Sequence, residues 1–354
     1  MKRLSAKDRL RHKRRILALK RKTEKLLRMR FYEYQRKNRP QRRPPPIRVL
    51  APVVFCIEKD DDRKELMRFL GELRRSYMRH KNGETLIIDF SGTRRFIANG
   101  ALLFFAELTR LIEYGAGRIR LRCKQPMNDR ASQVLEQIGV YALCSHPSHG
   151  KPYLDDVVHW RVARGSDVNN SLCAPSIEEF DEKLTEPLVD GLLRGLGEAM
   201  TNAVHHAYMA TRNDELNYPQ PRNDWWMFSQ SKDGFLSVVF CDLGVGIPTT
   251  LPVKKPWVYR TLEALGLANS DADCISEAIK DSRSRTGQPG RGKGLGDILD
   301  VVSKLKYGAA AVYSNRGCYI LKDDDHSSFN LKDSILGTLI SWRIPLNGAL
   351  RNGA

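Results

Sequence analysis

The sequence predicts a chain of two domains, of α/β and α+β class, behind a basic helical arm. Its 354 residues are enough for roughly two or three domains, and 41% hydrophobic against 28% charged residues is too apolar for a disordered chain. Strand and helix patterns alternate over residues 47–145, and a second set in a different order fills residues 170–346. Nearly all of the excess positive charge lies ahead of both segments.

The arm, residues 1–46, is the source of most of the net charge of +18. Residues 1–48 hold 20 Lys and Arg side chains against three acids, and the rest of the chain holds 39 against 38. A capping box at Ser5–Asp8 and the lack of Gly and Pro predict a helix to about Lys37, before the stiff spacer Pro44-Pro45-Pro46. Such a helix could bind nucleic-acid phosphates, follow an acidic membrane surface, or serve as a solvated arm that docks a protein.

The composition also bears on location. No apolar run approaches the ~18 residues of a membrane helix, and the N-terminus is too charged for a secretory signal. The seven cysteines are never closer than 21 residues, which argues against a CxxC-type zinc site and a disulfide framework. We therefore expect a cytoplasmic protein with no membrane span.

Residues 47–145 are expected to form an α/β layer with a mixed or parallel sheet, because strands and helices alternate. In chain order, the patterns predict a strand pair or bent strand (49–57), a helix (62–78), a strand (85–90), a helix (97–114), a strand (118–123) and a helix (129–138).

Several stretches of this layer resemble the STAS domain of anti-anti-sigma factors: 86–92, 96–103, 118–121 and 134–139. The resemblance is one of pattern, and an unrelated small α/β layer is the alternative. In that family a Ser or Thr just before the Gly at the start of the second helix is often phosphorylated. Here Asn99 precedes Gly100, so we expect no phosphorylation at this position. Asn99 would then mark a lost switch or cap the helix.

Residues 146–169 are expected to link the domains, with a strand around 157–162, and residues 347–354 to form a tail.

The pattern over 187–208 predicts a long helix with one apolar face. The residues of that face are Leu188, Leu192, Leu196, Met200, Ala203 and Ala207. On another face, Glu198, Asn202 and His206 are four residues apart, so they lie within an arc of about 80°.

Two glycine-rich segments follow this helix. An apolar strand over 235–241 runs into Asp242-Leu-Gly-Val-Gly-Ile-Pro248, where the glycines would let the backbone approach a flat ligand and Asp242 offers an acceptor. Further on, Gly290-Arg-Gly-Lys-Gly-Leu-Gly-Asp297 precedes an apolar helix. Glycine amides at a helix N-terminus favour phosphate, although the spacing fits neither a Walker A loop nor a Rossmann fingerprint.

The order of these motifs is closely similar to the GHKL (Bergerat-fold) ATP-binding superfamily. A segment at 336–346, Leu-Gly-Thr-Leu-Ile-Ser-Trp-Arg-Ile-Pro-Leu, resembles the closing strand of that family. The resemblance covers residues 170–346 and implies a Bergerat α/β sandwich that binds ATP with Mg²⁺. It implies that Glu198 polarises the attacking water or helps hold the metal, that Asn202 coordinates Mg²⁺, and that Asp242 accepts from the adenine amine.

The same resemblance implies roles for the glycine segments. Gly244 and Gly246 would leave space for the purine, and Thr338 would lie beside the adenine edge. His206 matches a position where many relatives also have His; a hydrogen-bonded core residue is the alternative. The lid that would bind the phosphates comprises Gly290, Gly292, Lys293, Gly294, Leu295 and Gly296, with Lys293 a candidate γ-phosphate contact.

Three functions are compatible with this resemblance. The STAS-like neighbour favours a protein kinase or nucleotide-gated switch of the anti-sigma type that acts on a protein partner. The alternatives are a clamp-type ATPase, which needs a further transducer domain, and a non-catalytic nucleotide-gated module tethered to nucleic acid by residues 1–46. The sequence alone does not choose among them, nor does it give an oligomeric state.

Overall fold

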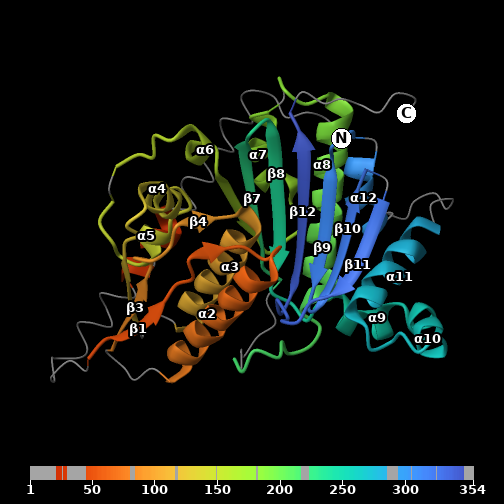
Figure 1. Cartoon of the computed structure of the whole chain (residues 1–354), viewed down its shortest axis with the longest axis horizontal. Helices are drawn as coiled ribbons and strands as arrows, with labels where there is room; N and C mark the ends of the chain where they lie inside the picture. Colours follow the sequence, from red (N-terminus) through yellow and green to blue (C-terminus); the bar gives the residue numbers. More distant parts are fainter. Residues whose placement is uncertain are drawn as a thin grey trace.

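The computed structural model describes residues 21–25, 27–29, 45–79, 84–115, 119–148, 150–180, 182–216, 223–284, 294–303, 305–323 and 325–346. Over these residues the chain is of mixed α/β class, with small parallel sheets beside one large antiparallel sheet (Figure 1). Of the predicted arm helix, residues 21–25 and 27–29 are helical, and the remainder of residues 1–44 lies outside the described residues.

The N-terminal part of the chain contains a three-stranded parallel sheet in the order β1-β3-β5, which confirms the parallel sheet predicted there. Its strands are β1 (Ile47–Leu50), β3 (Thr85–Asp89) and β5 (Arg120–Lys124). A second parallel pair joins β2 (Val54–Phe55) and β4 (Arg95–Phe96). The helices of this part are α2 (Asp60–Arg79), α3 (Ala98–Gly115), α4 (Asp129–Gln137) and α5 (Val140–Leu143).

The second part is a seven-stranded antiparallel sheet in the order β11-β10-β9-β12-β8-β7-β6. Its strands are β6 (Arg161–Gly165), β7 (Trp225–Lys232), β8 (Phe235–Asp242), β9 (Ala309–Ser314), β10 (Gly317–Lys322), β11 (Asp325–Asn330) and β12 (Thr338–Pro345). The strand expected around 157–162 is β6, which begins a few residues later and forms the edge of this sheet, and residues 155–158 before it form the short helix α6 (Asp155–Val158).

Helices cover one face of the seven-stranded sheet. They are η1 (Asn170–Leu172), α7 (Ala174–Glu178), α8 (Glu186–Asn202), α11 (Asp271–Ser284) and α12 (Leu295–Ser303). The predicted apolar face of α8 is buried in the core beneath them. Two further helices, α9 (Ile247–Lys254) and α10 (Pro256–Ala264), pack on α11 in a small separate cluster. The long helix ends earlier than its pattern predicts, because residues 203–207 form a π turn, η2 (Ala203–Ala207). Single π turns inside helices often mark functional sites.

On the other face of the seven-stranded sheet, α3 of the N-terminal part packs against β7, β8 and β12 (Figure 1). Neighbouring residues of a strand point to opposite faces, so Trp225 packs toward α8 and Trp226 toward α3. The rings of Phe105 on α3 and Phe228 on β7 have centroids 5.5 Å apart. One hydrophobic core thus runs from the three-stranded sheet through α3 to the large sheet. The two expected domains share this core.

Two further observations concern the whole described chain. No helix within the described ranges is both long and apolar enough to cross a membrane. All seven cysteines lie among the described residues and are free thiols, six of them buried.

Candidate functional site

The first element of the candidate site is Asp242, the last residue of β8. It pairs in register with Thr338 at the start of β12 and is 5% exposed. Its Oδ1 accepts the backbone N–H of Gly244 at 2.9 Å. Burial raises the pKa of Asp242 to about 6, although the amides of Gly244 and Thr338 and the positive charge of Arg212 oppose the rise. Asp242 is therefore a desolvated acceptor at a strand end.

Gly244 and Gly246, the two glycines after Asp242, are required for close packing within the chain. A Cβ on Gly244 would lie 2.3 Å from the carbonyl oxygen of Ala207 in the π turn. Gly246 has φ +83°, which side-chain-bearing residues rarely adopt, and a Cβ there would lie 2.6 Å from Asn315 Nδ2. The amide of Val245 donates to Ala207 O at 2.8 Å. The glycines hold this loop against the end of the long helix, which is a packing role beside the ligand-facing role that the resemblance implies.

Thr338 belongs to a hydroxyl pair beside Asp242. Its Oγ1 lies 3.0 Å from Oγ of Ser314, the last residue of β9, and Ser314 Oγ in turn accepts the amide of Ile247 at 2.8 Å. Both side chains are buried. The ends of β8, β9 and β12 and the loop after β8 are thereby joined by polar contacts at one edge of the sheet. Ser314 was not among the residues predicted from the sequence, because nothing in its neighbourhood marks a motif.

Of the residues predicted for the second face of the long helix, Glu198 and Asn202 lie in α8 and His206 lies in the π turn η2. Glu198, Asn202 and His206 are all half-buried, unlike the buried apolar residues between them. Burial raises the pKa of Glu198, and the nearby carboxylate of Asp297 raises it further. Burial lowers the pKa of His206, and the positive charge of Lys254 lowers it further. A contact with the His205 backbone raises this pKa and so partly opposes both effects. His206 Nδ1 is buried and has no hydrogen-bond partner in the described part of the chain.

The second glycine segment reaches the same helix from the other side. Gly290, Gly292 and Lys293 lie outside the described residues. Gly294 has φ +59°, and Leu295 and Gly296 begin α12, where Gly296 N donates to Ser282 Oγ at 2.8 Å. A Cβ on Gly195 of α8 would lie 3.2 Å from Val301 of α12, so the two helices pack closely.

Sequence reasoning missed three neighbours of the site. Asp297 was seen only as the end of the glycine segment, yet its charge acts on Glu198. Arg212 is 7% exposed and acts on Asp242 from a loop that has no motif. Tyr208 donates its hydroxyl to Asp224 O and accepts the amide of Leu243 at 3.1 Å. Of these three residues, only Asp297 had a signal in the sequence, because it directly follows Gly296 at the end of the glycine segment.

In the N-terminal part of the chain, Asn99 has a different role from a helix cap. Asn99 lies inside the first turn of α3 and is 3% exposed. Its Oδ1 accepts the amides of Gly100 at 2.6 Å and Ile57 at 3.4 Å, and its Nδ2 donates to Glu58 at 2.8 Å. The side chain therefore joins α3 to the loop before α2.

No group of three or more His, Cys, Asp or Glu side chains among the described residues is arranged to hold a metal ion by itself. No family model matches this chain, and a comparison with curated proteins finds no similar sequence. The resemblance to the ATP-binding superfamily thus rests on the order of its motifs.

Proposed function

We propose that this chain is an ATP-binding regulatory protein that acts as a protein kinase or nucleotide-gated switch on a protein partner. One observation carries the proposal. The loop after Asp242, the described end of the second glycine segment (294–297) and the helix face with Glu198, all far apart in the sequence, meet around the second half of the long helix. The loop after Asp242 packs on the π turn at Ala207, and α12 packs on α8 with Asp297 near Glu198.

Adenine recognition is assigned to Asp242 and Thr338. A buried carboxylate with few competing donors favours a ligand that brings an amine, because an unpaired buried acceptor is costly. Asp242 is 5% exposed and Thr338 7% exposed, at paired ends of adjacent strands. The phosphates would then extend toward the N-terminus of α12, where helix amides and the dipole favour negative charge.

The oxygen ligands near the phosphates fit Mg²⁺. This ion usually takes one or two protein ligands, with phosphate oxygens and waters completing its octahedron. Asn202 and Glu198 are one turn apart and half-buried, so they could supply that pair. When bound, the ion would neutralise phosphate charge. Because the pKa of Glu198 is raised, its carboxylate is a stronger base than an exposed Glu and could take a proton from water.

Calorimetric titration with ATP and Mg²⁺ tests the proposal. We expect Asp242→Asn to weaken ATP binding by roughly 1–3 kcal/mol, about 5- to 150-fold in Kd, because an amide donor would face the adenine amine. The matched control is Asp233→Asn, in the turn at the other end of β8, where φ +50° is well tolerated by Asn. Equal ATP affinity in the two variants, with both folded, would exclude the assigned adenine site.

The type of activity is decided by γ-labelled ATP. Label transferred to the chain or to a protein partner supports a kinase. Free phosphate supports a clamp-type ATPase, and tight binding without turnover supports a nucleotide-gated module.

A further inference from the structure

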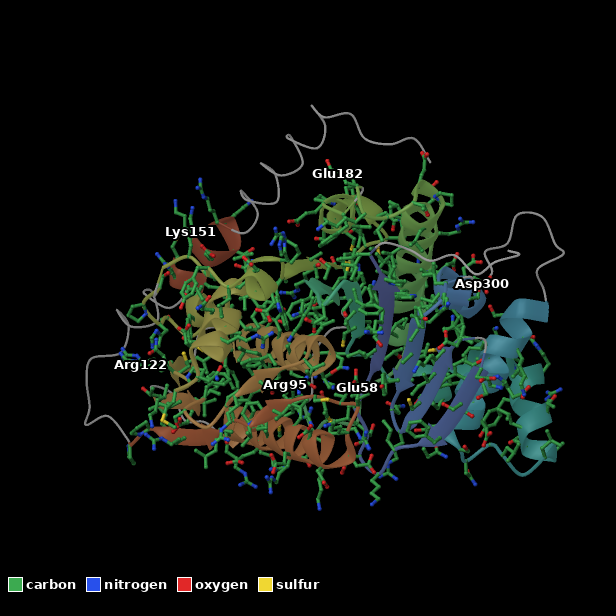
Figure 2. All side chains as sticks on the ribbon, turned by 45° about the horizontal axis from the view of Figure 1, so that its top comes forward. Glu58, Arg95, Arg122, Lys151, Glu182 and Asp300 are labelled. Atoms are coloured by element: carbon green, nitrogen blue, oxygen red, sulfur yellow. The ribbon has the colours of Figure 1, made fainter. Side chains whose placement is uncertain are left out.

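One face of the three-stranded sheet is partly exposed in the described part of the chain. Val49, Leu86, Ile88 and Leu121 point into the core and are at most 6% exposed. The alternate residues point the other way, and among them Arg48, Arg122 and Lys124 are exposed. Arg122 lies on the side of the molecule away from the seven-stranded sheet (Figure 2).

This face carries an open hollow of about 650 Å³ lined by cationic and apolar side chains. Its cations are Arg48, Arg122 and Lys124, and its apolar lining includes Ile87, Pro126 and Met127. Met127 is 88% exposed. The hollow adjoins the carboxyl ends of parallel strands, where ligands of α/β sheets commonly bind.

The charges of the hollow are only partly balanced. Asp89 lies 3.6 Å from Arg48 Nε and 3.7 Å from Lys124 Nζ, and its side chain is 3% exposed. Arg122 makes no ion pair with any described residue, and its guanidinium has donors for a phosphate. Three cations thus face one buried carboxylate. Such an excess attracts an anionic ligand.

The spacing of the cations favours a chain of regularly repeated charges. In register, Arg48, Ile87 and Arg122 form one row across the sheet, so the two arginines are about 10 Å apart. Lys124 follows Arg122 by two residues, about 6.6 Å along β5. The basic arm, with 19 Lys and Arg among residues 1–46, enters this sheet directly at β1.

We propose that this face, defined by Arg48, Ile87, Arg122, Lys124 and Met127, binds single-stranded nucleic acid. The cations would contact successive phosphates, and the exposed apolar side chains would contact the bases. In proteins that bind single strands without sequence preference, a positively charged groove follows the phosphate backbone. An open hollow on a narrow sheet accommodates one strand more readily than a rigid duplex. The binding is separate from the proposed ATP site.

The test is fluorescence anisotropy of a labelled 20-nucleotide RNA of mixed sequence with the full chain, over a series of salt concentrations. Arg122→Glu should weaken binding about tenfold and lower the slope of log affinity against log salt by about 1, the change expected for one lost phosphate contact. The matched control is Arg68→Glu, an exposed arginine of α2 in the same part of the chain, with the same change in net charge. It should change affinity less than about twofold, since charges distant from the strand are screened.

The thermal midpoint and ATP affinity of both variants are measured in parallel, and Arg122→Gln replaces Arg122→Glu if the latter unfolds. Equal weakening by the substitutions at residues 122 and 68 would overturn the proposal. A labelled polyglutamate peptide is titrated in the same way. Loss of polyglutamate binding in Arg122→Glu, with unchanged RNA binding, would assign the face to an acidic protein and also overturn it.

Discussion

Asp242 couples the candidate site to the stability of the fold. Burial raises its pKa to about 6 from the usual 3.8. Because the folded-state pKa exceeds the unfolded one, the protonated carboxyl stabilises the fold fully below about pH 4, and this contribution is lost as pH rises through about 6. At about 1.4 kcal/mol per pKa unit, the loss is on the order of 3 kcal/mol.

Asp242→Asn, neutral at every pH, should escape this loss. We therefore expect its free energy of unfolding to gain about 3 kcal/mol relative to the natural chain between pH 4 and pH 7, measured by urea unfolding at each pH. Asp233→Asn, at the opposite end of β8, controls for the general effect of removing a carboxylate. Parallel stability curves for the natural chain and Asp242→Asn would show that Asp242 titrates normally.

Among the elements, α3 joins the two parts of the chain through a buried ion cluster. Glu107 on α3 is 1% exposed, accepts from Arg74 of α2 at 2.8 Å and pairs with Arg212 from the loop after η2. Burial alone would raise the pKa of Glu107, but the charges of Arg212, Arg74 and Arg110 outweigh it and lower the pKa to about 2. Arg212 also acts on Asp242, so the cluster adjoins the candidate site.

Glu107→Gln should destabilise the chain by roughly 3–5 kcal/mol at pH 7, because it removes the buried carboxylate that pairs with both Arg74 and Arg212. Glu113→Gln, on the same helix, removes a 2.7 Å pair with Arg164 whose side chains are 22% and 27% exposed. That control should cost less than about 1 kcal/mol. Chemical denaturation measures both, and similar losses in the two variants would mean that the buried cluster contributes no more than a surface pair.

The elements also show how far sequence patterns reach. The apolar face of α8 was predictable, because a 3.6-residue period reports directly on burial, and the end of β8 was predictable from Asp242 and the glycines. The π turn at 203–207 was not, since it depends on the loop of Gly244 packing against Ala207. The ion cluster was also hidden, because Glu107 and Arg212 are 105 residues apart and neither lies in a motif.

At the scale of the whole molecule, the shared core changes the expected relation between the two parts. The sequence pattern predicts separate domains joined by a linker over 146–169. In the structure, Trp160 from that segment packs against Phe228 at 5.9 Å, and α3 covers the large sheet. Separate domains were predicted because the hydrophobic periods of strands (about 2 residues) and helices (about 3.6 residues) show that one face of an element is buried. They do not show which other element covers that face.

The charge of the molecule, unlike its core, is segregated along the sequence. Residues 1–48 carry a net +17, so removing residues 1–46 should abolish binding to duplex DNA while leaving ATP affinity unchanged. Each phosphate neutralised on a duplex contributes about 0.9 to the slope of log affinity against log salt, so the full chain should show a steep slope. Gel shifts across salt, with thermal unfolding to check that the shortened chain is folded, measure this.

The shortened chain should keep weak, salt-dependent binding to single-stranded RNA that Arg122→Glu removes, because Arg122 lies on the sheet face rather than in the arm. Retained duplex binding after the deletion would place the duplex-binding surface on the body of the molecule, and absence of binding in both forms would leave a protein as the partner of the arm.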